Sequence, residues 1–509
     1  MEVILDGEHL TIEQVHLVAR EGARVSIANS AMDKINTCRT FIEDFVASGE
    51  AIYGVTTGIG EFARIRVSPE MGEQLQKNIV YSHAAGVGKV LPVPDVRSAM
   101  VLRINTLSRG NSGVRLSTVQ TIVEMLNKGV TPVVFEKGSL GASGDLSPMS
   151  QIALVVMGEG EALYQGERIP GAEAMERAGI EPVNLSYKEG LGIINGSQLL
   201  TGMSALIIYD AERIMKNAQI ASAMSIDALR SVETAYDARL HAARPFRGQN
   251  IVAANLRKLF KNSEIMADKS GKVQDGYSLR CTPQVLGPSL DALTYVRGQI
   301  EIEMNSTADN PLFFPDDKVY LAGGNFHSQP IGMAMDFLGI ALAEVADISE
   351  RHTNRLMNPV LSGLPDFLVE GRGVNSGLMV AQYTAAALVS ENKVFAHPGV
   401  VDSISVSADQ EDHVPMSPVS VRKCREILTN VEDVISIEMY AAAQAMDFRK
   451  PHTPGEGTAV AYAKIREQVT FLETDRPLYP DIAIISGLVR DHTILDAVEA
   501  AIGEIVLRD

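Results

Sequence analysis

The sequence predicts a mainly helical protein in two parts, a mixed N-terminal region followed by a bundle of long helices. Glycine and proline interrupt the chain often up to about residue 190, and no proline then occurs between Pro182 and Pro245. Apolar residues make up 46% of the 509 residues, which is enough for a large core. A chain of this length exceeds the usual size of a single core. We therefore predict an N-terminal domain over 1–200 and a central and C-terminal helical bundle over 201–509.

The N-terminal region is predicted to be mixed because short apolar segments alternate with amphipathic stretches. The segment "TPVVFEKGSLG" at 131–141 is an example of the first kind. No internal repeat, low-complexity tract or obvious linker separates this region from the rest of the chain.

The later region is predicted to consist of long helices. One apolar helix face repeats at four-three-four-three spacing, through Ile331, Met335, Leu338, Leu342 and Val345. Residues 376–396 and 418–448 have the same character and are rich in Ala, Leu, Val and Met. Several such helices imply a bundle. Alanine-rich faces allow close approach, and we expect some of this surface to pack against other subunits.

Two stretches without charged residues, at 190–209 and 373–390, approach the length of a membrane span. Both contain several polar residues, among them Asn195 and Asn375. We therefore interpret them as helices buried within protein and expect no membrane partner.

The composition restricts the compartment and the partners. The formal net charge of -18 argues against nucleic acid and anionic membranes as partners. The three cysteines, Cys38, Cys281 and Cys424, form no CxxC pair and no disulfide framework. The N-terminal stretch "MEVILDGEHLTIEQV" has no basic region followed by an apolar run, so no signal peptide is predicted. A reducing cytoplasm is the simplest location.

Common cofactor motifs are missing from the sequence. It contains no P-loop, no GxGxxG after a strand and no HExxH, and the ten histidines lack ligand spacing. "GASGD" fails the GxSxG nucleophile motif because Asp145 stands where glycine is needed. We expect neither a metal nor a nucleotide cofactor.

The stretch "GSLGASGDLSP" at 138–148 carries the strongest chemical signal. An ordinary turn is one interpretation, since Gly, Ser and Asp favour turns. The other is covalent. If the Gly144 nitrogen attacks the Ala142 carbonyl carbon, a five-membered ring closes. Loss of the former Ala142 carbonyl oxygen as one water, and of the Ser143 hydroxyl as a second, leaves an exocyclic methylidene. The backbone compression this needs is tolerable only with glycine and small neighbours, and Asp145 could assist the dehydrations.

This stretch resembles the signature of the histidine and aromatic amino acid ammonia-lyases, whose prosthetic group is the same 4-methylidene-imidazol-5-one (MIO). The resemblance extends from about residue 5 to about 450. Further family motifs occur in the family's order: "YGVTTGIG" (53–60), "SHAAGVG" (82–88), "KEGLGIINGSQ" (188–198), "QDGYSLR" (274–280), "DNPLFF" (309–314), "GGNFH" (323–327), "GVNSG" (373–377) and "QEDH" (410–413).

The resemblance implies a carbon–nitrogen lyase that removes ammonia from an amino acid, in a homotetramer whose active sites are built from several subunits. It also implies the fumarase- and aspartase-like helical bundle. Membership of the fumarases and argininosuccinate lyases themselves is disfavoured, because their "GSSxMPxKxN" loop is missing. Residues Ala142 and Gly144 would be crosslinked and Ser143 dehydrated.

The resemblance also assigns roles to other residues. Tyr53 would be the base that takes the β-proton, and Arg280 would hold the substrate carboxylate through its planar fork. Asn195 and Tyr277 would line and orient the prosthetic group. Two further residues would lie nearby, Gln274 and Phe326. For each of these residues the alternative is ordinary packing or a surface ion pair.

Histidine is the favoured substrate, which would give trans-urocanate and ammonia. Ser82-His83 matches the histidine lyases, and a carboxylate at Glu411 can pair with an imidazole N–H, which a phenyl ring cannot offer. The sequence departs from the histidine lyases at Gly276, Ser328, Gln329, Asp409 and Pro415. A tyrosine or phenylalanine ammonia-lyase and an MIO-dependent aminomutase therefore remain alternatives. A catalytically silent helical assembly protein is a more distant one.

Overall fold

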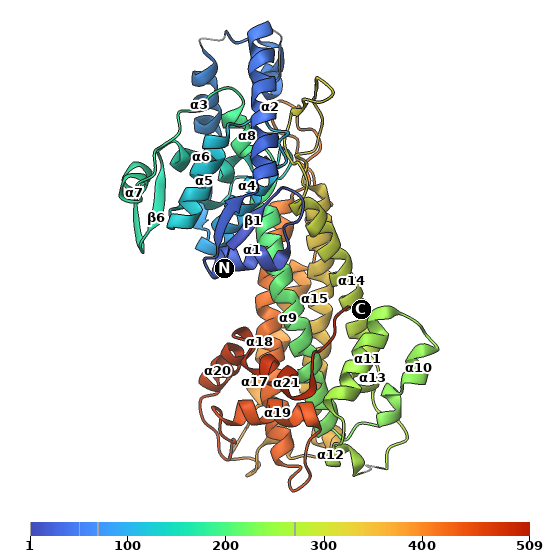
Figure 1. The fold of residues 1–509 in the computed structure, drawn as a ribbon. Helices are drawn as coiled ribbons and strands as arrows, with labels where there is room; N and C mark the ends of the chain where they lie inside the picture. Colours follow the sequence, from blue (N-terminus) through green and yellow to red (C-terminus); the bar gives the residue numbers. More distant parts are fainter. Residues whose placement is uncertain (1, 50, 69–70, 269–270, 509) are drawn as a thin grey trace. The chain divides into compact units, whose positions relative to one another are not determined.

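The computed structural model describes residues 2–49, 51–68, 71–268 and 271–508, which form two compact units (Figure 1). The first unit contains Met1–Tyr209, Arg297–Asp336 and Pro398–Arg422. The second contains Asp210–Val296, Phe337–His397 and Lys423–Asp509. Helices dominate the described residues, which confirms the predicted fold class.

The first unit mixes short strands with helices. Its N-terminal elements are β1 (Glu2–Leu5), α1 (Ile12–Arg20), β2 (Arg24–Ile27), α2 (Asn29–Ser48), η1 (Gly60–Arg64), α3 (Gly72–His83), β3 (Val87–Val90), α4 (Val93–Ser108), α5 (Leu116–Lys128), β4 (Thr131–Pro132), β5 (Phe135–Lys137), α6 (Leu146–Val156), β6 (Glu161–Tyr164), β7 (Glu167–Pro170), α7 (Gly171–Arg177) and α8 (Glu189–Ile194). A later hairpin adds β8 (Leu312–Phe314) and β9 (Val319–Leu321).

The strands form small separate sheets. Strand β1 pairs with β2 in parallel, while β3–β5, β4–β6–β7 and β8–β9 are antiparallel. Helix α4 is buried on almost every face, as expected for a helix at the centre of a core. It nevertheless carries two buried arginines, Arg97 and Arg103.

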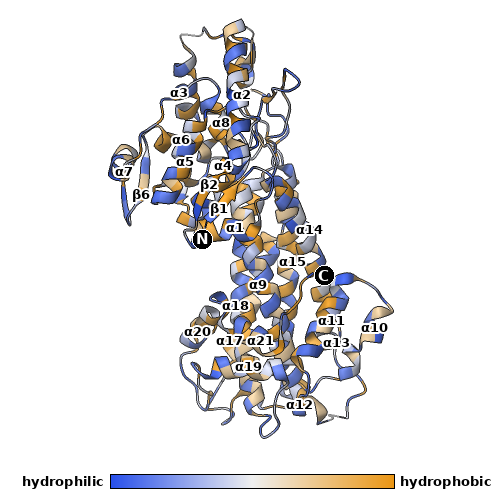
Figure 2. Cartoon of the chain, viewed as in Figure 1, coloured by the Kyte–Doolittle hydropathy of each residue, from blue (hydrophilic) through white to orange (hydrophobic). Residues whose placement is uncertain are grey.

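Four long helices have residues in both units: α9 (Gln198–Ala228), α14 (Thr282–Met304), α15 (Gln329–Met357) and α18 (Ser417–Asp447). Each carries both hydrophobic and hydrophilic stretches (Figure 2). The predicted apolar face at 331–345 lies on α15, and its five residues are each at most 1% exposed. The sequence period therefore identified a true buried face.

The second unit adds short helices and one further long one. These elements are η3 (Glu233–Tyr236), α10 (Ala238–Ala242), α11 (Arg247–Leu259), α12 (Glu264–Ala267), α13 (Tyr277–Arg280), α16 (Pro359–Ser362), η4 (Asp366–Leu368), α17 (Met379–Phe395), α19 (Glu456–Arg466), α20 (Tyr479–Arg490) and α21 (Thr493–Ile502). Helices α17 and α18 confirm the helices predicted over 376–396 and 418–448.

The two uncharged stretches differ from each other. Residues 190–209 are buried, as predicted, but they form the end of α8 and the start of α9, separated at 195–197. The prediction that 373–390 is buried is wrong for the single chain, because α17 exposes apolar side chains such as Val380 (55%) and Tyr383 (60%). Among the described residues, no helix is long and apolar enough to cross a membrane.

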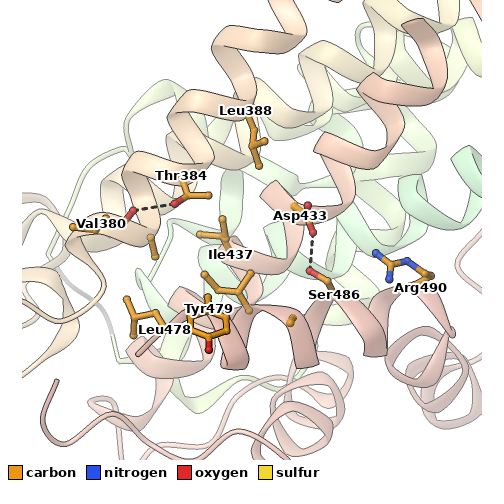
Figure 3. Close-up of a pocket in the computed structure, with 12 residues that line it drawn as sticks. Val380, Thr384, Leu388, Asp433, Ile437, Leu478, Tyr479, Ser486 and Arg490 are labelled. Atoms are coloured by element: carbon orange, nitrogen blue, oxygen red, sulfur yellow. Dashed lines mark hydrogen bonds between the residues drawn. The ribbon is translucent and has the colours of Figure 1, made fainter. Parts of the chain in front are cut away.

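The exposed surface of α17 borders a groove of about 530 Å³ in the second unit (Figure 3). The groove lies between α17, α18 and α20, and Ile437 and Tyr479 contribute to its lining. At one end the Ser486 hydroxyl donates to Asp433 at 2.9 Å. None of the predicted site residues lines this groove, so the candidate active site must be sought elsewhere.

Candidate active site

The turn that contains Ser143 is tightly folded. Gly141 and Gly144 have φ values of +80° and +78°, in the left-handed region that glycine adopts at no steric cost. A Cβ atom on Gly144 would lie 2.2 Å from the backbone carbon of Gly196. Because the opposing atoms belong to the backbone and cannot rotate away, only glycine fits at position 144.

Hydrogen bonds join this turn to the 195–197 segment between α8 and α9. The Asp145 N–H donates to the Gly196 carbonyl at 2.7 Å, and the Gly196 N–H donates to the Ser143 carbonyl at 3.3 Å. Asn195 Nδ2 also donates to the Ser143 carbonyl, at 3.1 Å. Two N–H donors therefore converge on the Ser143 carbonyl oxygen, an arrangement that stabilises negative charge developing on it.

The other amide atom of Asn195, Oδ1, has no hydrogen-bond partner among the described residues. Asn195 is 4% exposed, and its Oδ1 accepts no hydrogen bond from the described residues. Buried polar atoms in proteins are nearly always paired. A free acceptor beside Ser143 is therefore suited to a donor on a bound molecule.

Glu411 lies on a tight loop at 403–413 that contacts the same turn. Three consecutive residues of this loop, Ser407 to Asp409, have positive φ values, and Val406 and Glu411 form a backbone bridge. Val414 packs against Ala142. The Ser143 hydroxyl donates to Glu411 Oε1 at 3.1 Å, across a sequence separation of 268 residues. The structure therefore brings together two predicted site residues.

Tyr53 lies on the loop before η1 and is half-buried. Its hydroxyl oxygen accepts a hydrogen bond from the Gly60 N–H at 2.9 Å, and Gly60 lies near Ser407 of the Glu411 loop. Burial raises the pKa of Tyr53, the Gly60 hydrogen bond lowers it, and the Glu411 charge raises it, so the net pKa is above its ordinary value. The negative charge of Glu411 therefore disfavours ionisation of the Tyr53 hydroxyl.

Asp145 is completely buried at the start of α6. Burial raises its pKa to about 7, although a hydrogen bond from the Leu200 N–H at 2.9 Å, another from Ser139 Oγ at 3.4 Å and the charge of Arg103 act in the opposite direction. A carboxyl group with a pKa near neutrality can both give and take a proton. This suits the dehydrations expected at the neighbouring triplet.

Arg103 supports the 195–197 segment from the core. Its guanidinium donates to the Gly192 carbonyl at 3.1 Å and, through Nη2, to the Asn195 carbonyl and to Gln198 Oε1. Arg103 is 1% exposed, and its position is fixed by acceptors at the end of α8 and the start of α9. It therefore holds the backbone on which Asn195 and Gly196 stand.

Phe326 is tied to the same segment through its backbone. The Ser197 hydroxyl donates to the Phe326 carbonyl at 3.2 Å. Two residues later, the Ser328 hydroxyl donates to the Gly141 carbonyl at 2.8 Å. The loop of Phe326 is thereby fixed against the Ser143 turn.

His83 is the last residue of α3 and is half-buried. Its Nδ1 lies 2.7 Å from the Ile79 carbonyl and 3.0 Å from the Ser82 hydroxyl. These hydrogen bonds, which involve its own helix, orient the ring. They do not join His83 to another predicted site residue among those described.

The remaining predicted site residues belong to the second unit. Gln274 is exposed and Tyr277 is 73% exposed. The Arg280 guanidinium stacks on the Tyr277 ring at 4.7 Å, and its buried Nε has no partner among the described residues. The structure therefore pairs Tyr277 with Arg280 within the second unit.

Sequence reasoning did not identify Arg103 or Gly196 as individual site residues. For Arg103 a signal exists, because it is a lone charge within the apolar run "AMVLRINTL" of α4. A charge on a fully buried helix must find acceptors. For Gly196 the signal is weaker, since its φ of +112° and its closeness to the Ala308 carbonyl become evident only in the fold.

Comparison with known proteins shows similarity over almost the whole chain. The family model described as "Aromatic amino acid lyase" matches residues 10–467. The histidine ammonia-lyase of Alkaliphilus oremlandii is 50% identical over 502 residues, covering 98% of this chain and 99% of that protein. The crystal structure of histidine ammonia-lyase from Trypanosoma cruzi has a TM-score of 0.92 at 39% identity, covering 98% and 96% of the two chains. Tyrosine aminomutase from Streptomyces globisporus has a TM-score of 0.95 at 37% identity, covering 100% of both.

The raised pKa of Asp145 predicts a specific dependence of stability on pH. Because the folded-state pKa of about 7 exceeds the ordinary value of 3.8, the folded protein holds this proton more tightly than the unfolded chain. The resulting stabilisation is complete below the unfolded pKa and is lost as pH rises through about 7. Asn at this position lacks the titration. Between pH 5 and 8 we expect the free energy of unfolding of the wild type to fall by on the order of 2–3 kcal/mol relative to that of Asp145→Asn.

Thermal unfolding of both proteins across this pH range tests the prediction. All other titrating groups are shared, so the difference between the two melting temperatures isolates Asp145. A change in ring closure in Asp145→Asn would shift its curve equally at every pH. Parallel profiles would therefore contradict the assignment.

Proposed function

Because this chain belongs to the aromatic amino acid lyase family, we propose that it is a histidine ammonia-lyase, which removes ammonia from L-histidine without oxidation to give trans-urocanate. The observation that carries the proposal is the 50% identity to a histidine ammonia-lyase over 98% of this chain. The contact between Ser143 and Glu411 supports it, because it places a carboxylate beside the reactive turn.

We propose that Ala142, Ser143 and Gly144 form the MIO group on which the family depends. When formed, this group supplies an electrophilic carbon to which the substrate amine can bond. The residues present fit it: glycine is the only residue that position 144 accommodates, and Asp145 has a pKa suited to the two dehydrations. Asn195 Nδ2 and the Gly196 N–H polarise the Ser143 carbonyl, which increases the electron demand of the triplet.

The same geometry suggests how the chain holds the substrate. The free Oδ1 of Asn195 can accept a hydrogen bond from the α-ammonium group. Glu411 Oε1 accepts the Ser143 hydroxyl in the unmodified chain. Loss of that hydroxyl as water removes the donor and leaves the carboxylate oxygen available to the imidazole N–H. Arg280 is proposed to bind the substrate carboxylate, with Gln274 and Tyr277 beside it, and His83 to face the imidazole.

Tyr53 is the proposed base for the β-proton. Its hydroxyl oxygen already accepts the Gly60 N–H, a donor that stabilises the phenolate. Its raised pKa implies that turnover increases as pH rises on the alkaline side, because a larger fraction of Tyr53 is then ionised.

We also propose that the protein is a cytoplasmic homotetramer in which several subunits contribute to each site. The exposed apolar side chains of α17 supply surface suited to contact between copies. Among the described residues, Cys38, Cys281 and Cys424 form no disulfide, which suits a reducing compartment.

The substrate and product are tested by incubating the enzyme separately with histidine, tyrosine and phenylalanine. We expect urocanate from histidine as the main product. Glu411→Gln should lower kcat/KM for histidine by about ten- to a hundredfold, since a partly buried polar partner is lost. Preference for tyrosine or phenylalanine would contradict the assignment. A β-amino acid product would instead indicate an aminomutase, the activity named for the Streptomyces globisporus structure.

The prosthetic group is tested by intact mass. The wild type should be lighter than its sequence by two waters, and peptide mapping should locate the loss to the peptide that contains residues 142–144. Ser143→Ala should abolish this loss and nearly all turnover. An active wild-type protein of full mass would exclude ring formation.

The role of Tyr53 is tested by Tyr53→Phe, which removes one oxygen and little packing. Positioned acid–base groups contribute about 10²- to 10⁴-fold, so kcat should fall by at least that factor. Binding of substrate analogues and the two-water mass loss should persist. A kcat close to that of the wild type would exclude Tyr53 as the base.

A further inference from the structure

The turn that carries Tyr277 and Arg280 is a short helix that directly precedes the long helix α14. Helix α13 consists of four residues, only Cys281 separates it from α14, and the Thr282 hydroxyl donates to the Ser278 and Leu279 carbonyls. Because a helix this short does not hold its shape in isolation, its direction is set by α14 and by contacts with the rest of the second unit. Because Arg280 is proposed to bind the substrate carboxylate, these contacts bear on substrate binding.

Two contacts fix the ends of the segment. Buried Asp275 accepts hydrogen bonds from the Ser231 hydroxyl at 2.7 Å and the Val232 N–H at 2.6 Å. The Tyr236 hydroxyl donates to the Leu279 carbonyl at 3.0 Å. These contacts hold the residues on either side of Tyr277 and Ser278.

A buried charged pair holds the centre of the turn. His352 on α15 is 0% exposed. Its Nε2 lies 2.7 Å from the Ser278 carbonyl, and its Nδ1 lies 2.8 Å from Glu438 Oε1 on α18. Glu438 also accepts the Ser225 hydroxyl at 2.7 Å and the Ser349 hydroxyl at 2.6 Å. The imidazole therefore bridges the turn to the centre of the helical bundle.

With Glu438 as a carboxylate, the hydrogen-bond pattern makes His352 an imidazolium. A carbonyl and a carboxylate are acceptors only, and a neutral imidazole has a single N–H. Both contacts are then made only when both ring nitrogens are protonated. Burial lowers the pKa of His352, but the charge and hydrogen bond of Glu438 outweigh burial and raise it.

We propose that the buried His352–Glu438 pair is a positioning device for the Tyr277–Arg280 turn and sets the direction in which Arg280 meets the substrate carboxylate. The proposal rests on the proposed function of Arg280. His352 holds the carbonyl of Ser278, two residues before Arg280, and the Arg280 guanidinium in turn stacks on Tyr277. A buried ion pair stabilises a fold little, so its best-supported use is to fix one arrangement.

The test is the kinetics of His352→Gln and Glu438→Gln. Each removes the charge while keeping a similar shape. We expect KM for histidine to rise by about ten- to a hundredfold, as for the loss of a buried charged partner, with a smaller change in kcat. Histamine, which has the same ring and amine but no carboxylate, should inhibit as it inhibits the wild type. The two-water mass loss should persist, because Ser143 lies in the other unit.

Ser225→Ala and Ser349→Ala are the matched controls. Each removes a hydroxyl donor to Glu438 without touching residues 275–280. They should lower the melting temperature and leave KM unchanged. A wild-type KM in folded His352→Gln or Glu438→Gln, or an equal weakening of histidine and histamine, would overturn the proposal.

If neither glutamine variant folds, hydrogen exchange of the wild type gives the answer. The amides of Arg280 and Cys281, which donate to Gly276 and Tyr277, should exchange as slowly as the core of α15. Rapid exchange would overturn the proposal.

A wild type that does not use histidine contradicts the proposed function instead. The same comparison is then made with the amino acid that it does use and the corresponding amine without a carboxylate.

Discussion

The close crossing of two backbone segments at Gly144 and Gly196 is the constraint on which the rest of the candidate site depends. Two backbone hydrogen bonds cross there in opposite directions, and neither residue could carry a Cβ, because each would meet main-chain atoms at about 2 Å. This crossing aligns the Ser143 carbonyl with Asn195 and seats Asp145 at the start of α6. The loops of Phe326 and Glu411 then pack on the outside of the same turn. The candidate site is built from four segments that are distant in the sequence, and their positions therefore depend on one contact between two glycines.

Buried charges recur where the chain must fix a direction. Arg103 holds the carbonyls of the 192–195 segment, and His352 holds the carbonyl of Ser278. Lys188 pairs with Asp309 at 2.8 Å, with both side chains fully buried. Apolar replacements of similar volume could pack such positions as stably, but they would not specify where a carbonyl points. In each case the charged group contacts a backbone carbonyl oxygen. The need of a buried charge for a hydrogen-bond partner therefore fixes the course of the backbone at that point.

The sequence was informative about periodic structure and about the reactive triplet. The spacing from Ile331 to Val345 identified a buried helix face, because helical period and burial are directly linked. The stretch around Ser143 was recognisable because its glycines and small residues are needed locally. Contacts such as that between Ser143 and Glu411 were not derivable, since nothing local relates residues 268 positions apart. The prediction that both belong to one site rests on the family resemblance. The exposure of α17 was missed for a similar reason, because an apolar face does not reveal whether its partner is the same chain or another.

The glycine crossing also sets the order of folding and ring closure. The turn can be compressed against Gly196 only after α8, α9 and the segment that carries Ala308 are in place, so ring closure would follow folding and not precede it. If the chain loses two waters as proposed, unfolding alone would not restore them, because the change is covalent. The covalent state of each molecule, with or without the loss of two waters, would therefore show whether it had once reached the native state, whatever its present conformation. A purified sample that contains both masses would be a mixture of molecules with different folding histories.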